Sequence, residues 1–247
     1  LHGRYGEDGY IQTILESEKV KYTHSGVLSS SLAIDKELSK KIFIKNNILT
    51  PAYIKFIFKK KLEKRKILQK IKKKFNFPVV IKPINEGSSL GVYICNNFNN
   101  FKNKYNKLKK KYDRIYVEEY IPGKEIQVAI MGKTALGAIE LRPKRKFYDY
   151  KAKYSNKAKT KHIMPAKLSK KKYIEVLKIA KKAHNLLGCR GITRSDFRYY
   201  KDKFYLLETN TQPGMTNLSL VPEIAKYKGI NFEDLVAWMI KDASCKR

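Results

Sequence analysis

Three oxygen-bearing side chains stand close together near the end of the chain: Asp196, Glu208 and Asn210. The residues around them are typical of two strands, 195–200 and 203–208, that pair across a tight turn. Side chains alternate along a strand, so Glu208 and Asn210 share a face, and a hairpin centred near Asp202 places Asp196 opposite Glu208. Two carboxylates and an amide suit Mg²⁺, which prefers oxygen ligands and usually keeps water and phosphate oxygens in its shell. The pattern therefore predicts a magnesium site.

A surface hairpin with ordinary polar positions is the alternative interpretation. The apolar pair at 206–207 argues against it, because it indicates partial burial, and buried unpaired carboxylates are costly. Arg194 lies two residues before Asp196 on the same strand face, and the Pro213-Gly214 turn exposes backbone N–H groups nearby. A fixed cation and a backbone N–H near a phosphoryl site can stabilise a developing oxyanion, although Pro-Gly alone is merely a turn.

A second candidate region lies around an apolar strand at 77–82. Lys82 comes near the end of this strand, and a lysine on an otherwise buried strand needs an anionic partner, for which ATP phosphate is the natural candidate. The following loop, 86–91, offers backbone N–H groups and hydroxyls for phosphate oxygens. The loop lacks the GxxxxGK[ST] pattern of a Walker loop, so on its own it is a weak signal.

Acidic residues end one strand and open the next. Glu118 and Glu119 close the strand 115–119, and Glu125 follows the Pro122-Gly123 turn. Such acceptors could hold an adenine amino group and ribose hydroxyls. A hinge whose carboxylates neighbour surface lysines explains them equally well.

An aromatic and cationic stretch, 147–154, lies within a long segment that has no clear period, 142–162. A segment of this length is suited to a functional loop or lid. It could exclude water and carry Lys153 to a phosphate and Tyr154 to a substrate. An ordinary aromatic-rich loop is the alternative.

The elements that must position these residues are mixed. Hydrophobic periodicity predicts helices at 10–18, 30–46, 67–75, 98–112, 173–187 and 232–241. Strands are expected after Pro51 and at 77–82, 92–95, 115–119, 126–131, 134–141, 195–200 and 203–208. The strands at 77–82 and 92–95 are expected to form a hairpin, as are those at 126–131 and 134–141.

Composition limits the class of protein. The chain has 247 residues, 43% of them hydrophobic, so one large or two to three small domains are expected. The net charge of +32 would suit a nucleic-acid or membrane partner, but the lysines lie mostly on helices whose other face is apolar. Without a helix-turn-helix, zinc or RNA-binding signature, a solvated surface explains this charge better, and neither a nucleic acid nor a membrane is expected as a partner.

Three widely spaced cysteines form no CxxC pair, which argues against a disulfide framework or a zinc site. No apolar run is long enough to cross a bilayer, so we expect a cytoplasmic protein. The chain starts at Leu1 without a methionine, and we expect an N-terminal piece to be missing.

Seven motifs occur in one order along the chain: LHGRYGEDGYIQTILE, YTHSGVLSSSLAIDK, VVIKPINEGSSLGV, YVEEYIPGKE, FYDYKAKY, GITRSDF and LLETNTQPGMTNLSLVP. In this order they resemble the D-alanine:D-alanine ligases of the ATP-grasp superfamily. The resemblance implies an α/β (α+β) ATP-grasp fold. It divides the chain into 1–24, the remnant of an N-terminal Rossmann-like (pre-ATP-grasp) domain, a central subdomain 25–118 and a C-terminal subdomain 119–247.

The resemblance also implies roles for individual residues. ATP phosphates would contact Lys36, Lys82 and Lys153, and the nucleotide would be bordered by Glu118, Tyr120, Ile121, Glu125 and Phe147. Two Mg²⁺ ions, with Mn²⁺ as a possible substitute, would bind Asp196, Glu208 and Asn210. The oxyanion site would be formed by Arg194 and the Gly214 N–H. The D-alanine sites would be lined by His2 and Glu7, by Ser88 and Tyr154 near the first substrate, and by Ser219 and Leu220 near the carboxylate of the second.

The implied reaction joins two D-alanines through D-alanyl phosphate, for peptidoglycan precursor synthesis. Tyr154 favours the dipeptide over D-alanyl-D-lactate. Another ATP-grasp carboxylate-amine ligase, a D-alanine:D-lactate or D-serine ligase, and a basic nucleic-acid-binding module remain the alternatives. The resemblance suggests a homodimer. The family's upstream Gly-rich loop and a substrate-orienting glutamate are missing from this sequence, so the chain alone is expected to be weakly active or inactive.

Overall fold

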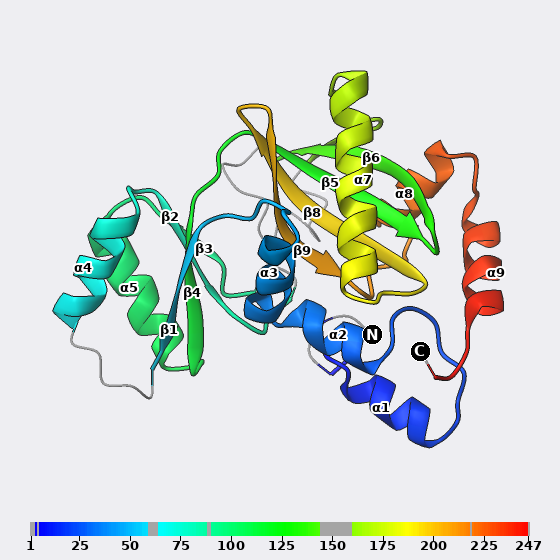
Figure 1. Ribbon diagram of the computed structural model, residues 1–247, viewed down its shortest axis with the longest axis horizontal. Coiled ribbons are helices and arrows are strands. Elements are labelled where there is room, and N and C mark those ends of the chain that lie inside the picture. The colour runs from blue at the N-terminus through cyan, green and yellow to red at the C-terminus, as the bar shows by residue number, and fades with distance from the viewer. Residues whose placement is uncertain are drawn as a thin grey trace. The chain divides into compact units, whose positions relative to one another are not determined.

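The computed structural model describes residues 3, 5–58, 64–87, 90–143, 160–217 and 219–246. The chain forms two compact units, one made of Pro51–Ile121 and the other of Leu1–Thr50 together with Pro122–Arg247. Figure 1 shows the elements of each unit. Within the described residues, no helix is long and apolar enough to span a membrane. The predicted division at residues 25 and 119 stays a prediction.

The smaller unit is a four-stranded antiparallel sheet with two helices. Its strands are β1 (Tyr53–Ile57), β2 (Val79–Pro83), β3 (Tyr93–Cys95) and β4 (Arg114–Glu119), in the spatial order β1-β4-β2-β3. The helices α4 (Lys64–Lys74) and α5 (Phe98–Lys109) bury Ile71, Phe101 and Leu108 against Val79 and Ile81 of β2. The predicted order of strands and helices in this region is confirmed, including the hairpin of β2 and β3.

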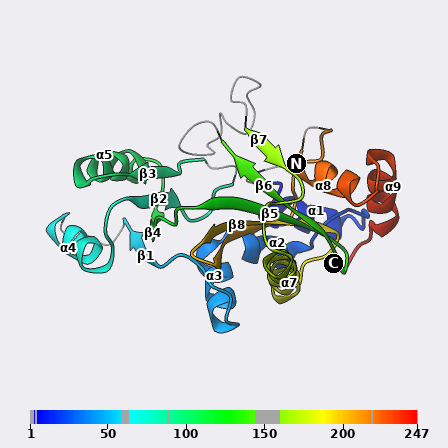
Figure 2. The same ribbon diagram turned by 90° about the horizontal axis from the view of Figure 1, so that it is seen from above.

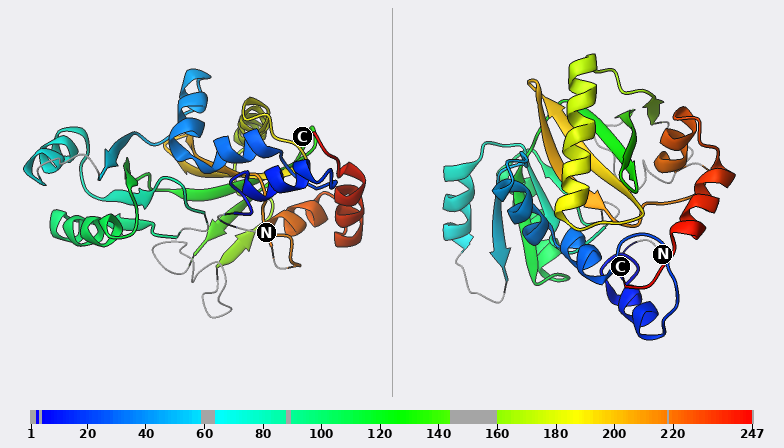
Figure 3. Two further views of the ribbon diagram at one scale, coloured as in Figure 1. Left: turned by 90° about the horizontal axis from the view of Figure 1, so that it is seen from below. Right: turned by 45° about the vertical axis from the view of Figure 1, so that its right-hand side comes forward.

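The larger unit is built on a five-stranded antiparallel sheet. Its strands are β5 (Lys124–Met131), β6 (Thr134–Arg142), β7 (Lys161–Ile163), β8 (Ile192–Tyr200) and β9 (Lys203–Asn210), in the spatial order β7-β6-β5-β8-β9. The long helix α7 (Lys170–Leu186) lies against one side of the sheet (Figures 2 and 3). Val176, Ala180 and Ala183 of this helix pack with Ile126 and Val128 of β5. Residues of β5 with the opposite parity therefore face the other side.

Two helices close the chain, α8 (Leu220–Tyr227) and α9 (Phe232–Asp242). Leu220, Val221 and Ile224 of α8 pack with Ile139 and Ile192 of the sheet in a second core cluster. Helix α9 was predicted within one residue of its end, whereas α8 and β7 were not predicted. Helix α8 carries a proline in its first turn, where proline is tolerated but masks the helical pattern, and β7 has only three residues.

The N-terminal part of the larger unit contains three helices, α1 (Tyr10–Ser17), α2 (Val27–Ile34) and α3 (Lys36–Lys45). The single helix predicted at 30–46 is wrong. Asp35 has an extended backbone, with φ −79° and ψ 100°, and its side chain accepts hydrogen bonds from the N–H groups of Glu37 and Leu38 at 2.9 and 3.1 Å. Asp35 therefore caps a new helix, and Lys36 becomes its first residue.

Candidate active site

The hairpin of β8 and β9 places Asp196 opposite Glu208, as predicted. The turn residues Lys201 and Asp202 both have positive φ, 46° and 57°, as in the tight turns that favour hairpins. From this turn the strands pair regularly as far as Phe197 and Leu206, and the register then shifts. Leu207 is the extra residue of this β-bulge. The shift brings Glu208 into line with Asp196, and bulges of this kind often aim side chains at active sites.

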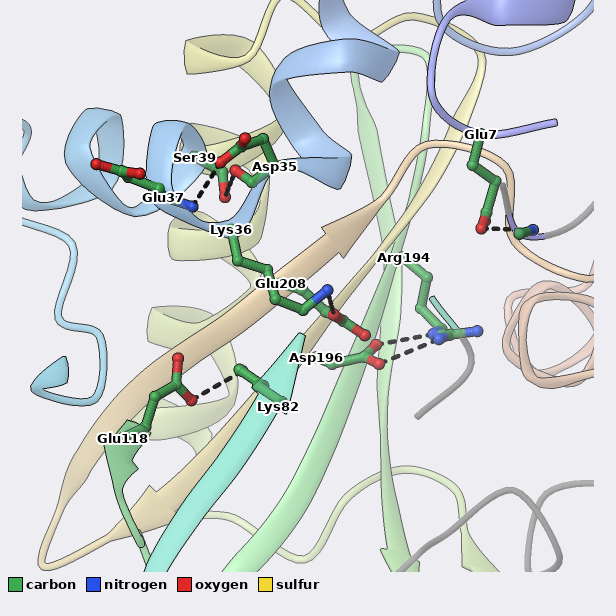
Figure 4. A network of polar contacts seen from close by, with 11 residues as sticks. Glu7, Asp35, Lys36, Glu37, Ser39, Lys82, Glu118, Arg194, Asp196 and Glu208 are labelled. Carbon is green, nitrogen blue, oxygen red and sulfur yellow. Dashed lines mark hydrogen bonds and ion pairs between the residues drawn. The ribbon is translucent and has the colours of Figure 1, made fainter. Parts of the chain in front are cut away.

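Asp196 is held by Arg194 through two contacts. Arg194 Nε donates to Oδ1 at 2.8 Å and Nη2 donates to Oδ2 at 3.0 Å, with only 11% and 7% of the two side chains exposed (Figure 4). A planar guanidinium fits a carboxylate in this two-point geometry. Arg194 is also the register partner of Asn210 on β9. The predicted cation, the first carboxylate and the amide residue thus occupy adjacent positions on neighbouring strands.

Glu208 forms an ion pair with Lys36. Lys36 Nζ lies 3.2 Å from Glu208 Oε2, and the lysine is almost fully buried (Figure 4). The start of α3 fixes the lysine, because the Asp35 cap sets where the helix begins. A predicted phosphate-binding lysine and a predicted metal-binding carboxylate are therefore in direct contact in the structure.

The residues Asp196, Glu208 and Asn210 fit a hard divalent cation by the chemistry of their donors. Asp196 and Glu208 are opposed on paired strands, and both carboxylates already attract a cationic group. The described residues include no group of three or more His, Cys, Asp or Glu side chains suited to a metal. With only two carboxylates in the set, an ion here would need the Asn210 amide and oxygens from water or phosphate to complete its shell.

The loop before α8 brings Gly214 and Ser219 together. A Cβ on Gly214 would lie 3.1 Å from Ser219 Oγ, and the same hydroxyl accepts from the Thr216 N–H at 3.0 Å. Ser219 precedes the first residue of α8, Leu220, whose side chain is buried in the core. Leu220 could therefore meet a substrate only through its backbone, at a helix N-terminus that suits a carboxylate.

In the smaller unit, Lys82 and Glu118 form a buried ion pair. Their Nζ and Oε2 atoms are 2.8 Å apart, and 7% and 3% of the side chains are exposed. The anionic partner that a buried lysine requires is therefore present within the unit, so this argument alone does not require a phosphate. Ile121 is buried and Tyr120 is half-buried, both just beyond the end of β4.

Glu7 and Glu125 lie apart in sequence but both belong to the larger unit. Glu7 is 3% exposed and accepts a hydrogen bond from the Gly3 N–H at 2.7 Å. Glu125 contacts two residues that the sequence did not single out, Arg198 and Gln127. Arg198 lies two residues after Asp196 on β8, and Gln127 lies two residues after Glu125 on β5. The alternation of side chains that identified Arg194 could therefore have identified both residues as well.

Five predicted site residues lie outside the described residues: His2, Ser88, Phe147, Lys153 and Tyr154. Most of the predicted lid, 142–162, lies outside them too. Their roles stay predictions.

Comparison with known proteins gives a consistent result. A family model described as "D-ala D-ala ligase C-terminus" matches residues 42–241. A curated relative, the D-alanine–D-alanine ligase of Pelagibacter ubique (strain HTCC1062), is 62% identical over 247 residues, which cover all of this chain and 80% of the relative.

Two solved structures are similar throughout. The D-alanine–D-alanine ligase of Bacillus anthracis complexed with ATP has a TM-score of 0.83 and 29% identity, over 98% of this chain and 76% of that one. The VanG D-Ala:D-Ser ligase of Enterococcus faecalis has a TM-score of 0.86 and 27% identity, over 98% of this chain and 70% of that one.

Proposed function

Because the chain belongs to the D-alanine–D-alanine ligase family, with its ATP-grasp fold, we propose that it joins two D-alanines at the expense of ATP. The product, D-alanyl-D-alanine, would serve peptidoglycan synthesis. The observation that carries the proposal is the opposed pair of carboxylates, Asp196 and Glu208. Arg194 forms an ion pair with the first, and Lys36 forms one with the second. This arrangement is what a phosphoryl-transfer site requires, since it combines divalent-metal ligands with fixed positive charge.

In the first half-reaction, a carboxylate oxygen of one D-alanine attacks the γ-phosphorus of ATP. The bond to the β-γ bridging oxygen breaks, ADP leaves and D-alanyl phosphate forms. Asp196, Glu208 and Asn210 would hold a Mg²⁺ ion, which when bound would supply positive charge to the phosphate oxygens. Lys36, already beside Glu208, contributes a second cation that can turn from this carboxylate to a phosphate.

In the second half-reaction, the deprotonated amine of the other D-alanine attacks the carbonyl carbon of D-alanyl phosphate. Negative charge develops on the carbonyl oxygen, and phosphate then leaves. Arg194 and the Gly214 N–H stabilise this oxygen. Arg194 is suited to the role because its two contacts with Asp196 fix the guanidinium.

The other assigned roles follow the family resemblance. Lys82 binds ATP phosphate, and the nucleotide is bordered by Glu118, Tyr120, Ile121 and Glu125. The D-alanine sites are lined by Glu7 and by Ser219 with the backbone of Leu220. The last assignment is supported by the position of Ser219 directly before the N-terminus of α8. A cytoplasmic location and a homodimer also belong to the proposal.

A second candidate is a ligase that accepts D-serine in place of the second D-alanine. The similarity to the E. faecalis D-Ala:D-Ser ligase favours keeping it, because the two folds correspond over almost all of this chain. Substrate choice then depends on a few side chains rather than on the fold.

The test measures ADP formation by the 247-residue chain with Mg-ATP and D-alanine, D-lactate, D-serine or L-alanine. Mass spectrometry identifies the products. We expect only slow ADP formation, since the chain alone is expected to be weakly active, but this formation should depend on D-alanine and give one D-alanyl-D-alanine per ADP. Preferential formation of D-alanyl-D-serine would select the second candidate. ADP release at a rate that does not depend on D-alanine would contradict both candidates.

A further inference from the structure

Glu125 is contacted from two sides on the face of the large sheet that carries Asp196. Arg198 Nη1 lies 3.4 Å from Glu125 Oε2, and Gln127 Nε2 lies 3.5 Å from Glu125 Oε1. The strand register places Glu125 directly beside Arg198, and Gln127 directly beside Asp196. Register partners in antiparallel strands have side chains on the same face, so the contact of Arg198 follows from the pairing of β5 with β8. The contact of Gln127 follows from the alternation along β5, which puts residues two apart on one face.

Arg198 is itself anchored. Its Nη2 donates to the Gly123 carbonyl oxygen at 2.8 Å. Gly123 has φ 95°, and a Cβ on it would lie 2.2 Å from the Tyr199 carbonyl oxygen. The turn before β5 therefore needs glycine at this point and holds its carbonyl against β8. The guanidinium is fixed at one end by this backbone and presents its other end to Glu125.

Burial shields the contacts of Glu125 from water. The side chains of Arg198 and Glu125 are 19% and 12% exposed, so the ion pair is only partly screened by water. Gln127 is completely buried, and its Oε1 is a buried atom without a hydrogen-bond partner. An amide in this position has little freedom to turn, and its nitrogen therefore limits where the Glu125 carboxylate can go.

We propose that Arg198 is a positioning residue for the nucleotide, which holds the Glu125 carboxylate so that it accepts hydrogen bonds from the ribose hydroxyls of ATP. The inference rests on the proposed function, in which Glu125 borders the nucleotide. A carboxylate has about four lone-pair sites on its two oxygens. It can therefore keep a contact with Arg198 and still accept from the 2′- and 3′-hydroxyls.

This role predicts a loss that depends on the ribose. Without Arg198, Glu125 can rotate away, and the carboxylate must be reordered each time ATP binds. Binding of ATP should weaken, whereas binding of 2′,3′-dideoxy-ATP, which has no hydroxyls to offer, should change little. A purely structural role would weaken both nucleotides by the same factor.

The experiment uses calorimetry to measure binding of Mg-ATP and Mg-2′,3′-dideoxy-ATP to the 247-residue chain. In Arg198→Met, the dissociation constant for ATP should rise roughly tenfold, the scale of one hydrogen bond to a charged group, and that for the dideoxy nucleotide by less than about twofold. Arg198→Lys keeps the charge but not the two-point geometry and should be intermediate. The matched control is Arg190→Met, since Arg190 is exposed and contacts Ser244 instead.

A double-mutant cycle shows whether Arg198 acts through Glu125. In a Glu125→Gln background, Arg198→Met should change ATP affinity by less than about twofold. Circular dichroism checks the fold of each variant, and if Arg198→Met does not fold, the comparison of Arg198→Lys with wild type carries the test.

Four outcomes would overturn the inference. An equal effect on both nucleotides, or none on ATP, would remove the positioning role and leave the proposed function intact. Equal wild-type affinities for the two nucleotides would contradict the ribose contact of Glu125. A wild-type chain that does not bind Mg-ATP would contradict the proposed function itself.

Discussion

Lys36 and Glu208 come from different elements, the first residue of α3 and the far end of β9, and their charged groups are 3.2 Å apart. A predicted phosphate ligand and a predicted metal ligand thus form an ion pair. Binding of Mg-ATP would replace this contact with two others, one from the carboxylate to the metal and one from the lysine to a phosphate. The ion pair therefore holds the two predicted ligands close together.

The substitution Lys36→Met should separate these two effects. Affinity for Mg-ATP should fall about tenfold, because a phosphate loses a charge-assisted contact. Affinity for free Mn²⁺ should rise, because Glu208 no longer pairs with a lysine. Calorimetry measures the first and electron paramagnetic resonance titration the second. Lys41→Met is the control on the same helix, where the lysine is 61% exposed and pairs with Glu37, and both affinities should stay unchanged.

The substitution Asp196→Asn should weaken Mn²⁺ binding at least about tenfold, since an amide oxygen is a poorer ligand for a hard cation than a carboxylate. It should also lower the free energy of unfolding by roughly 2 to 4 kcal/mol, because the buried Arg194 would lose its two-point contact with a carboxylate. Urea titration measures the second effect. Asp202→Asn makes the same chemical change at the hairpin turn and should leave metal binding as it is. Unaltered Mn²⁺ affinity in Asp196→Asn would contradict the metal site.

Loss of the α3 cap should affect both stability and binding. Asp35→Ala removes the hydrogen bonds that start α3, and the free energy of unfolding should fall by about 1 kcal/mol. Asn231→Ala removes the corresponding cap of α9, where Asn231 accepts from the Asp234 N–H at 2.7 Å, and should cost a similar amount. Only Asp35→Ala should also weaken Mg-ATP binding, because Lys36 follows the cap directly. Equal ATP affinities in the two variants would show that the cap does not position Lys36.

Stability should depend on pH through His184. Burial lowers the pKa of this histidine from 6.5 to about 4, although a hydrogen bond with the backbone of Cys189 raises it in part. Between these values the unfolded chain binds a proton that the folded chain does not. The free energy of unfolding should therefore be fully retained above pH 6.5 and fall as the pH drops towards 4, by on the order of 3 kcal/mol in total.

The control for this pH dependence is His184→Asn, whose amide can still reach the Thr193 hydroxyl that lies 2.8 Å from His184 Nδ1. Urea titrations between pH 4 and 7 should show a shallower dependence in the variant than in wild type. Parallel curves would mean that other groups cause the acid sensitivity.

Sequence periodicity was sufficient where one pattern extended over a whole element. It located α7 and the hairpins. The opposition of Asp196 and Glu208 was also predicted, but it depends on the bulge at Leu207, because regular pairing from the turn would place Leu207 opposite Asp196. It failed at Asp35, because the residues on both sides of the cap suit a helix and the break depends on one side-chain hydrogen bond. It also gave no reason to pair Lys82 with Glu118, since that contact requires the register of β2 with β4, which the sequence does not contain.

The bulge at Leu207 divides β9 into two parts with separate tasks. Before it, Phe204 and Leu206 follow the alternation of the hydrophobic core, and after it Glu208 and Asn210 follow the alternation of the site. In a strand without a bulge, the core residues and the site residues would follow a single alternation. Turning one set to the other face of the sheet would then turn the other set as well. With the bulge between them, Phe204 and Leu206 can face the core while Glu208 and Asn210 face the predicted site.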